Sequence, residues 1–200
     1  PVVPVSLTKD INLITRMVLP IVTQYNITGT GEKQSGLGDA VVSMFFSPKN
    51  TKNGFTWGAG PAFLVPTGTN DFLTTDQWGV GPTAVALKQV NGWTIGGLVN
   101  QIWSVAGDDD RSDVNQMFVQ PFVIYNWKSG AGAGLVTEWT QNWEIDQATV
   151  WMTPTFSALT SFGSQKVQFL FGPRFNLSAA SSQAKADMGW RAGIVFLFPK

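Results

Sequence analysis

Residues 166–178, KVQFLFGPRFNLS, are the stretch that decides the fold. Every second residue from Val167 to Leu177 lacks a polar side chain, whereas the alternate positions from Lys166 to Ser178 carry five polar side chains. This strict alternation is typical of a β-strand with one apolar face and one polar face. Strands of globular proteins usually have about 5–6 residues, and a tilted strand needs about 9–11 to cross a hydrocarbon layer. The 13 residues of this stretch are therefore long enough to span a membrane.

The same alternation recurs along the chain, clearly in residues 37–47 and 188–198 and more weakly in 132–143. No segment has the periodicity of a helix. Prolines interrupt several candidate strands, and we expect them at β-bulges or near the ends of the barrel, because proline cannot donate to a ladder. These prolines are Pro61, Pro82, Pro121, Pro154 and Pro173. We predict eleven strands, at residues 2–8, 11–24, 37–47, 54–66, 78–89, 93–106, 113–127, 132–143, 148–159, 166–178 and 188–198.

The composition is apolar and aromatic without helical spans. Charged residues make up 13% of the chain, against about 25% in ordinary soluble domains. Nine tryptophans and 14 phenylalanines are present, yet no run approaches the roughly 18 apolar residues of a membrane helix. Two architectures fit these observations: a soluble all-β domain with a large core, or a transmembrane β-barrel.

The residue types that are missing narrow the function. The chain has no histidine and no cysteine, which removes the Ser-His-Asp triad, the cysteine nucleophiles and the usual zinc ligands. We therefore expect no enzymatic activity. The 13 basic residues balance the 13 acidic ones, and no basic stripe indicates a nucleic-acid partner. Because the chain starts at Pro1 without a basic leader, we expect a mature form, a fragment or the ordered part of a longer protein.

The connections between the strands differ in length on the two sides. If the C-terminus is periplasmic, the long and acidic connections, YNITGTGEKQSG, TGTNDFLTTDQ, GDDDRSD, EIDQ and AASSQAKAD, all face outward. The short ones, TK, PKNTKN, VN, KSGA and SFGSQ, face inward. Outer-membrane barrels show this asymmetry. The aromatics fall into two belts at the strand ends, as expected at the two membrane interfaces: Phe55, Trp57, Trp93, Trp127 and Phe198 near the short turns, and Trp78, Trp103, Trp143 and Trp190 near the long loops.

These patterns predict an all-β fold, an antiparallel up-and-down transmembrane β-barrel in which residues 1–200 form a single domain. The polar positions of the strands then face the lumen. They are Arg16, Asp39, Asn100, Gln116, Gln120, Glu138, Arg174 and Arg191. Two interpretations of this pore-lining set remain open. Its charges set the selectivity of a channel, or they form a salt-bridge network that plugs a narrow barrel.

One outward loop concentrates carboxylates, namely Asp108, Asp109, Asp110 and Asp113, around Arg111. Hard cations such as Ca²⁺ bind carboxylate oxygens, so this loop is a candidate cation site. The loop lacks the spacing and the distal glutamate of an EF-hand. The alternative is a solvated loop in which Arg111 pairs with a carboxylate, and apart from this candidate Ca²⁺ we expect no cofactor and no metal.

Several segments together resemble a group of bacterial outer-membrane barrel proteins that are usually labelled transporters, sometimes mislabelled neuromedin U, and are related to the channels of the meta-pathway of phenol degradation. The segments are NLITRMVLPIV, GLGDAVVSMFFSPK, WGAGPAFLVPT, WGVGPTAVALKQ, WSVAGDDDRSDVNQMFVQPF and FLFPK. The resemblance covers nearly the whole chain. It implies a Gram-negative outer membrane, with the lipid bilayer as a partner, and about one further strand before Pro1, so that the full barrel has twelve strands, an even number.

The end of the chain resembles the C-terminal signal by which barrel-assembly machinery receives its clients. Gly193, Phe196 and Phe198 carry this likeness, together with Arg191. The chain departs from the common form because Pro199 and Lys200 follow the last aromatic residue. The resemblance therefore implies that the assembly machinery is a partner and leaves the register of recognition open.

Our leading hypothesis is a channel of the outer membrane for the passive uptake of small solutes, hydrophobic or aromatic ones among them. The alternative is a plugged structural barrel whose outward loops bind a partner or assemble with copies of the chain into a homo-oligomer. A third architecture, a soluble lipocalin-like binder, conflicts with the apolar outward faces of the predicted strands.

Overall fold

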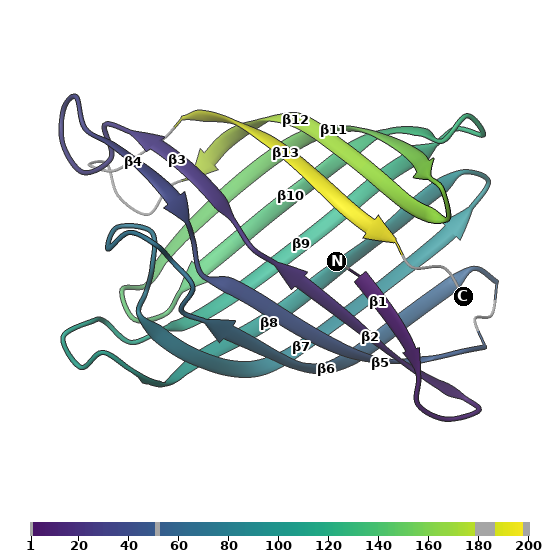
Figure 1. The fold of residues 1–200 in the computed structure, drawn as a ribbon, viewed down its shortest axis with the longest axis horizontal. Helices are drawn as coiled ribbons and strands as arrows, with labels where there is room; N and C mark the ends of the chain where they lie inside the picture. Colours follow the sequence, from purple (N-terminus) through teal and green to yellow (C-terminus); the bar gives the residue numbers. More distant parts are fainter. Residues whose placement is uncertain (1, 51–52, 179–186, 198–200) are drawn as a thin grey trace.

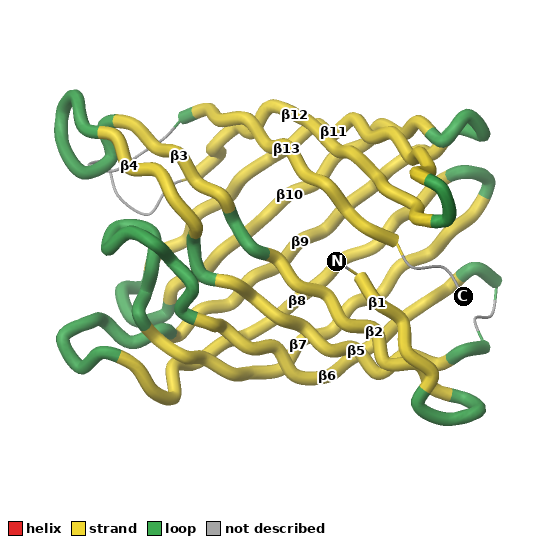
Figure 2. Tube along the Cα trace, in the orientation of Figure 1, coloured by secondary structure: helices red, strands yellow, loops and turns green. Residues whose placement is uncertain are grey.

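The structure, a computed structural model, describes residues 2–50, 53–178 and 187–197, and the regular elements in these residues are all β-strands (Figures 1 and 2). In that part of the chain no helix is long and apolar enough to cross a membrane. The strands are β1 Val2–Ser6, β2 Ile11–Val18, β3 Ile21–Tyr25, β4 Lys33–Leu37, β5 Ala40–Pro48, β6 Phe55–Val65, β7 Gln77–Val90, β8 Trp93–Gly107, β9 Asn115–Asn126, β10 Ala131–Asn142, β11 Gln147–Phe162, β12 Gln165–Ser178 and β13 Met188–Leu197.

Eleven of these strands form a closed barrel in the order β1-β13-β12-β11-β10-β9-β8-β7-β6-β5-β2. Neighbouring strands pair antiparallel except β1 and β13, which pair parallel through Val2 and Leu197. The parallel contact follows from the odd number of strands, because an up-and-down chain brings its first and eleventh strands into the same direction. The predicted fold class, an antiparallel β-barrel with eleven strands present, is confirmed.

The region between residues 19 and 39 differs from the prediction. The predicted strand 11–24 is broken at Leu19 and Pro20, and β4 consists of residues 33–36, predicted as loop, and Leu37, predicted as the start of the next strand. β3 and β4 make a separate two-stranded sheet that extends beyond the barrel wall (Figure 1). Pro20 has no N–H for a ladder, and its carbonyl oxygen instead accepts a hydrogen bond from the Gly38 N–H at 2.9 Å. The prediction of an irregular loop was therefore wrong for residues 33–36.

The two ends of the barrel differ in the length of their connections, as Figure 2 shows. One end carries the β3–β4 hairpin and the loops 66–76 and 108–114, whereas the other end has tight turns. The turn between β7 and β8 consists of Asn91 and Gly92, both with positive φ. Asn-Gly is the favoured pair for a two-residue hairpin turn, because its backbone twist matches that of the strands. One predicted outward connection, AASSQAKAD, lies almost entirely outside the described residues.

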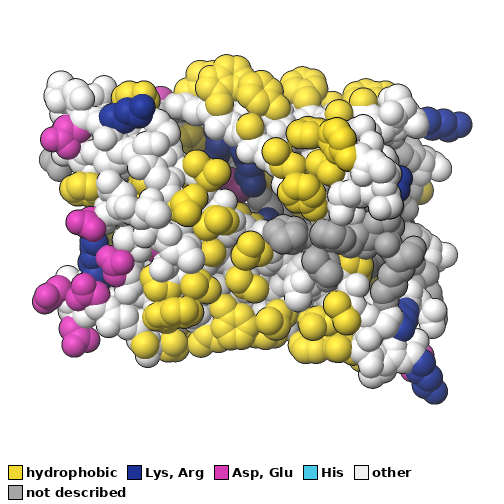
Figure 3. Space-filling view, viewed as in Figure 1, with side chains coloured by type: hydrophobic (Ala, Val, Ile, Leu, Met, Phe, Trp, Pro, Cys, Tyr) yellow, Lys and Arg dark blue, Asp and Glu magenta, His cyan; other side chains and the backbone are white. Residues whose placement is uncertain are grey.

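Apolar side chains cover the outer surface around the middle of the barrel, and charged side chains gather at its two ends (Figure 3). On β12 the predicted apolar face is exposed at Phe169, Phe171 and Leu177, although Val167 is buried. Eight of the nine tryptophans are exposed, namely Trp57, Trp78, Trp93, Trp103, Trp127, Trp139, Trp143 and Trp190. Both predicted aromatic belts are therefore on the outside, except that Phe198 lies outside the described residues. Trp151 is the exception among the tryptophans and is half-buried.

The inner face is lined by buried polar side chains together with a small apolar cluster. The buried polar residues on the strands include Ser43, Ser47, Thr83, Asn100, Gln120, Glu138 and Thr153. The apolar cluster consists of Ala62, Leu64 and Ile102, with Val41 and Val114 packed against it. The barrel therefore places polar groups inside and apolar groups outside, the reverse of a water-soluble domain.

The prolines within the strands interrupt the ladder on one side only. Between β5 and β6 the pairing stops after Ser43–Ala62 and resumes at Phe46–Ala59, so Pro61 lies in the gap. Similar gaps lie at Pro82 between β7 and β8, at Pro121 between β9 and β10, and at Pro154 and Pro173 between β11 and β12. The register is the same on both sides of each gap, so these sites are not the predicted bulges. Each proline lacks the N–H that the ladder would require there.

Glycines precede three of these prolines because the neighbouring strand comes very close. A Cβ atom at Gly60, Gly81 or Gly172 would collide with the backbone carbonyl oxygen of Met44, Gln101 or Pro154, respectively. Only a residue without a side chain allows this approach of two backbones. Gly97 is a natural comparison, because a Cβ atom there would lie 3.7 Å from its nearest neighbours.

We predict that Gly81→Ala destabilises the barrel, whereas Gly97→Ala leaves its stability nearly unchanged. The added methyl group at residue 81 forces β7 and β8 apart, which should cost about 1–3 kcal/mol. Denaturant unfolding followed by tryptophan fluorescence measures both variants. Equal stability of the two variants would contradict the close approach at Gly81.

Candidate functional site

A cluster of charged side chains lies inside the barrel around Glu138 of β10. Gln120 of β9 donates to Glu138 Oε1 at 2.7 Å, and Arg174 of β12 donates to Oε2 at 2.7 Å. Arg191 of β13 forms an ion pair with Oε1. Every second side chain of a strand lies on the same face of the sheet. The strands β9, β10, β12 and β13 therefore bring these four side chains together inside the barrel. Both oxygens of the buried Glu138 carboxylate are thus occupied.

Arg16 of β2 adds a third cation to this cluster. Its charge lies close enough to Arg191 and Glu138 to interact electrostatically with both. Within residues 2–50, 53–178 and 187–197, no hydrogen bond or ion pair to the Arg16 guanidinium is found. We call Arg16, Gln120, Glu138, Arg174 and Arg191 the lumen cluster. Its three positive charges and one negative charge give a net charge of +2.

Trp151 of β11 forms one wall of the lumen cluster. Its Cα pairs with that of Glu138, and the Arg174 guanidinium lies 4.5 Å from the centroid of its ring. A guanidinium over the face of an indole is held by the ring quadrupole and by dispersion. Arg174 Nε is buried without a hydrogen-bond partner, so the cluster has more donors than acceptors.

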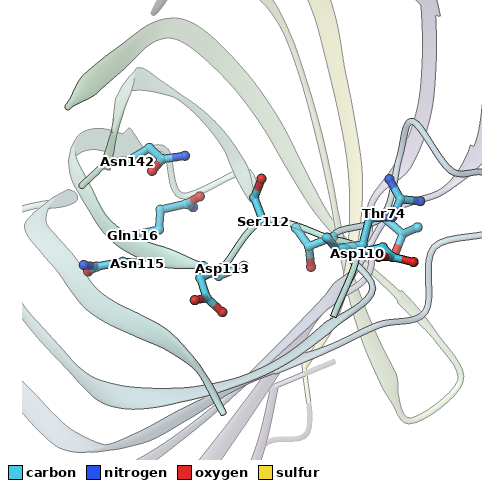
Figure 4. A pocket seen from close by; sticks show the side chains of 10 residues that line it. Thr74, Asp110, Ser112, Asp113, Asn115, Gln116 and Asn142 are labelled. Carbon is cyan, nitrogen blue, oxygen red and sulfur yellow. The ribbon is translucent and has the colours of Figure 1, made fainter. Parts of the chain in front are cut away.

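A cavity of about 390 Å³ lies at the end of the barrel that carries the long loops. It is lined by the loops 66–76 and 108–114 and the ends of β9 and β10. Figure 4 shows Asn115, Gln116 and Asn142 on one side of it and Thr74 and Asp110 on the other. We call this cavity the mouth pocket. It is lined by hydroxyl, amide and carboxylate groups, so it suits water and polar solutes.

Asp39, at the start of β5, ties the loop 66–76 to the rim of the barrel. Its Oδ1 accepts hydrogen bonds from the Gly68 N–H at 3.0 Å and the Thr74 hydroxyl at 2.8 Å. Its Oδ2 accepts from the N–H and the hydroxyl of Thr75, at 2.6 and 2.8 Å. Burial alone would raise the pKa of Asp39, but these hydrogen bonds, those of Thr75 first, together hold it below its ordinary value.

Arg111 connects the two loops to each other. Its guanidinium forms an ion pair with Asp76 at 2.7 Å and donates to the carbonyl oxygen of Asp71 at 3.1 Å. Gln77 Nε2 also donates to the carbonyl oxygen of Asp108 at 2.7 Å. These contacts therefore hold the loops 66–76 and 108–114 together along one side of the mouth pocket.

The carboxylates of the predicted cation loop do not converge. Asp113 accepts a hydrogen bond from the Ser104 hydroxyl, and Asp108 accepts one from the Asp110 N–H. In the part of the chain that the structure describes, no three acidic or other ligand-type side chains lie close enough together to hold a metal ion. Arg111 pairs with carboxylates of the other loop, as in the solvated-loop alternative, although its partners differ from those expected.

The structure brings together part of the predicted pore-lining set. Gln120, Glu138, Arg174 and Arg191 are in contact, with Arg16 beside them. Asn100 is buried on the inner face of β8. The other two predicted residues, Asp39 and Gln116, lie apart from the cluster, at the rim and in the mouth pocket.

The predicted assembly signal lies partly on β13, where Gly193 and the exposed Phe196 are found, and Phe198 falls outside the described residues. The sequence reasoning missed Trp151. The sequence pattern could have placed it, because Trp151 alternates in step with Thr149, Thr153 and Thr155, the polar positions that face the lumen.

We predict that Asp39→Asn loosens the loop 66–76, because an amide offers only one oxygen to four donors. Amide hydrogen exchange at Gly68 and Thr75 should become roughly tenfold faster or more. Asp71→Asn is the matched control, because the Asp71 side chain is 93% exposed and 4.0 Å from Arg111.

The same loosening should appear in the unsubstituted protein at acid pH. Because the pKa of Asp39 is lowered in the folded state, its contribution to stability is complete at neutral pH and is lost as the pH falls through that lowered pKa. Loop exchange that instead increases between pH 7 and pH 5, over and above the intrinsic rate, would argue against this role of Asp39.

Comparison with known families agrees with this architecture. A family model described as "Putative MetA-pathway of phenol degradation" matches residues 4–192. No match was found among curated proteins or among solved structures. The matched range includes β2 to β12, the first half of β13, and every residue of the lumen cluster and of the mouth pocket. The chain therefore belongs to the family of the MetA-pathway of phenol degradation.

Proposed function

We propose that this chain is a channel of a bacterial outer membrane, through which small solutes, hydrophobic or aromatic ones among them, diffuse passively. One observation carries the proposal: the barrel exposes a band of apolar and aromatic side chains and encloses a polar, charged interior. Lipid is the solvent that favours this inverted arrangement. A closed barrel is also one of the two structures that satisfy their backbone hydrogen bonds inside a bilayer.

The positions of the tryptophans support a membrane-spanning orientation. Trp93 and Trp127 lie at the short-turn end, and Trp78 and Trp143 lie at the end with the long loops. Indole rings favour the headgroup level, where the ring is in an apolar layer and the N–H reaches water. The two belts therefore match the two interfaces of a membrane, with the long loops outside the cell as in outer-membrane barrels.

The solute class rests on the family and on the chemistry of the lumen. The family description refers to the degradation of phenol, an aromatic compound that must enter the cell before it is degraded. The path that we propose leads from the mouth pocket past the lumen cluster to the short-turn end. We propose no catalytic role for the lumen cluster, whose polar groups would act as a selectivity element.

A plugged barrel that binds a partner or another copy of itself is the second candidate function. Two observations favour it. Ala62, Leu64 and Ile102 form an apolar cluster on the inner face, which occupies space in the lumen. The β3–β4 hairpin also extends beyond the wall and exposes Ile21 and Tyr25, which would suit contact with another protein.

We predict that Phe171→Asp prevents assembly into a bilayer, whereas Gln168→Asp is tolerated. Phe171 is 51% exposed on the outer face and stacks on Trp190 with ring centroids 5.1 Å apart, and Gln168 has the opposite parity. A carboxylate in the hydrocarbon layer should cost up to about 3 kcal/mol. Folding into lipid vesicles, measured by the heat-dependent shift in electrophoretic mobility, compares the two variants. Efficient insertion of Phe171→Asp would overturn the assignment of the outer face.

We also predict stepwise conductance when the purified protein enters a planar bilayer. Gln116→Trp places a large side chain in the mouth pocket and should lower the single-channel conductance by about half or more, because the current falls with the open cross-section of the path. Met117→Trp is the control, because residue 117 points to the other face of β9.

The outcome also separates the two candidate functions. If the unsubstituted protein gives neither current steps nor solute flux into vesicles, the channel hypothesis is wrong and the plugged barrel is favoured. Equal conductance of both tryptophan variants would place the path elsewhere in the lumen.

A further inference from the structure

Arg16 and Arg191 belong to the two strands between which the barrel closes. In the part of the chain that the structure describes, β2 and β13 are joined only through β1, and β1 pairs with β13 only at Val2 and Leu197. The ladder between β1 and β2 ends at Arg16, opposite Val2. Among the described residues, Met188 to Phe196 of β13 pair with β12 alone. We call this weakly paired region the seam. Figure 3 shows a hollow in this face of the barrel, between β13 and β2, with basic and acidic side chains inside it.

The charges beside the seam are unbalanced. Three guanidinium groups carry fifteen N–H donors in total, five on each. Glu138 is the one acidic side chain found among them in the described part of the chain, and both of its oxygens already accept hydrogen bonds. The net charge of +2 and the unpartnered Arg174 Nε would therefore be stabilised by a further hydrogen-bond acceptor with a negative charge.

The cations are the accessible members of the cluster. The side chains of Arg174 and Arg191 are 30% and 31% exposed, whereas that of Glu138 is 9% exposed. A solute inside the lumen consequently meets guanidinium groups and not the shielded carboxylate. The low-dielectric wall around it strengthens the resulting positive potential.

The geometry of the cluster also indicates the kind of anion. The cluster already holds one carboxylate, that of Glu138, between Arg174, Arg191 and the amide of Gln120. A guanidinium fork matches the two oxygens of a planar carboxylate. The Arg174 guanidinium lies over the Trp151 ring at the same point, and a planar aromatic ring can stack on a guanidinium plane.

We propose that the lumen cluster is a binding site for a small monovalent organic carboxylate, held by Arg16 and Arg191 across the seam. The inference deepens the proposed function by naming the solute class, and it rests on that function for its role in uptake. The bound carboxylate neutralises part of the excess charge and connects β2 to β13, so it stabilises the closed barrel as well as selecting the solute.

Thermal unfolding of the protein in detergent micelles tests the site without any need for conduction. The probes are benzoate and acetate, with benzamide as a neutral analogue of benzoate, at constant ionic strength in sodium chloride. A ligand that binds only the folded state raises Tm in proportion to its occupancy. We expect a saturable rise with both carboxylates, larger with benzoate, and no rise with benzamide.

Substitutions locate the binding. Arg16→Gln should weaken benzoate binding roughly tenfold or more, whereas Arg111→Gln, at the other arginine outside the cluster, should leave it unchanged. If Arg16→Gln does not fold, Arg16→Lys serves instead, because it keeps the charge and loses the fork, and it should still weaken benzoate binding. A carboxylate effect that persists in the Arg16 variant would overturn the proposal, and so would an equal effect of inorganic phosphate.

Ion selectivity gives a second and separate readout. In a salt gradient across a planar bilayer, the reversal potential of the unsubstituted channel should show preference for anions, and Arg16→Gln should reduce that preference. A conducting barrel without anion preference and without benzoate binding would refute the carboxylate site but would still support the proposed channel function. Benzoate binding to a barrel that does not conduct would support the site and refute the channel.

Discussion

The closed ring of backbone hydrogen bonds is the constraint on which the rest of this molecule depends. Strand pairing around the ring sends alternate side chains inward and outward, and this single geometric fact separates the apolar exterior from the polar lumen. Within the described residues, the ring has its least pairing between β1 and β13, where one parallel pair closes it. An odd number of strands makes a parallel junction unavoidable, and here the strand at that junction, β1, has only five residues.

Three of the five members of the lumen cluster, Gln120, Glu138 and Arg174, lie where the ladder is interrupted. The gap between β9 and β10 spans Gln120 and Glu138, and the gap between β11 and β12 spans Arg174. Prolines create these gaps, and the glycines before three of them allow the neighbouring backbone to approach. The polar side chains that define the candidate site therefore occupy the least regular level of the wall, in agreement with the tendency of functional sites to violate local rules of regular structure.

The two ends of the barrel have different physical roles. Tight turns connect the strands at one end, whereas at the other end Asp39 and Arg111 hold two loops beside the mouth pocket. These contacts use carboxylates and an arginine outside the apolar band. Ionic and hydrogen-bonded loops thus lie beside the mouth pocket, and a cluster with more cations than anions lies inside the lumen.

The sequence by itself determined the β-barrel, the strand positions, the outward aromatic belts and the inward polar residues, because a period of two residues is a local property of the chain. It did not determine the break at Pro20, the β3–β4 hairpin or the gaps at the prolines, because these depend on which backbone lies alongside. Only the tertiary structure decided that Glu138 meets Arg174 and Arg191 while Asp39 and Gln116 lie apart at the mouth. Such contacts join residues up to 53 positions apart, and the stagger and closure of the whole ring set them.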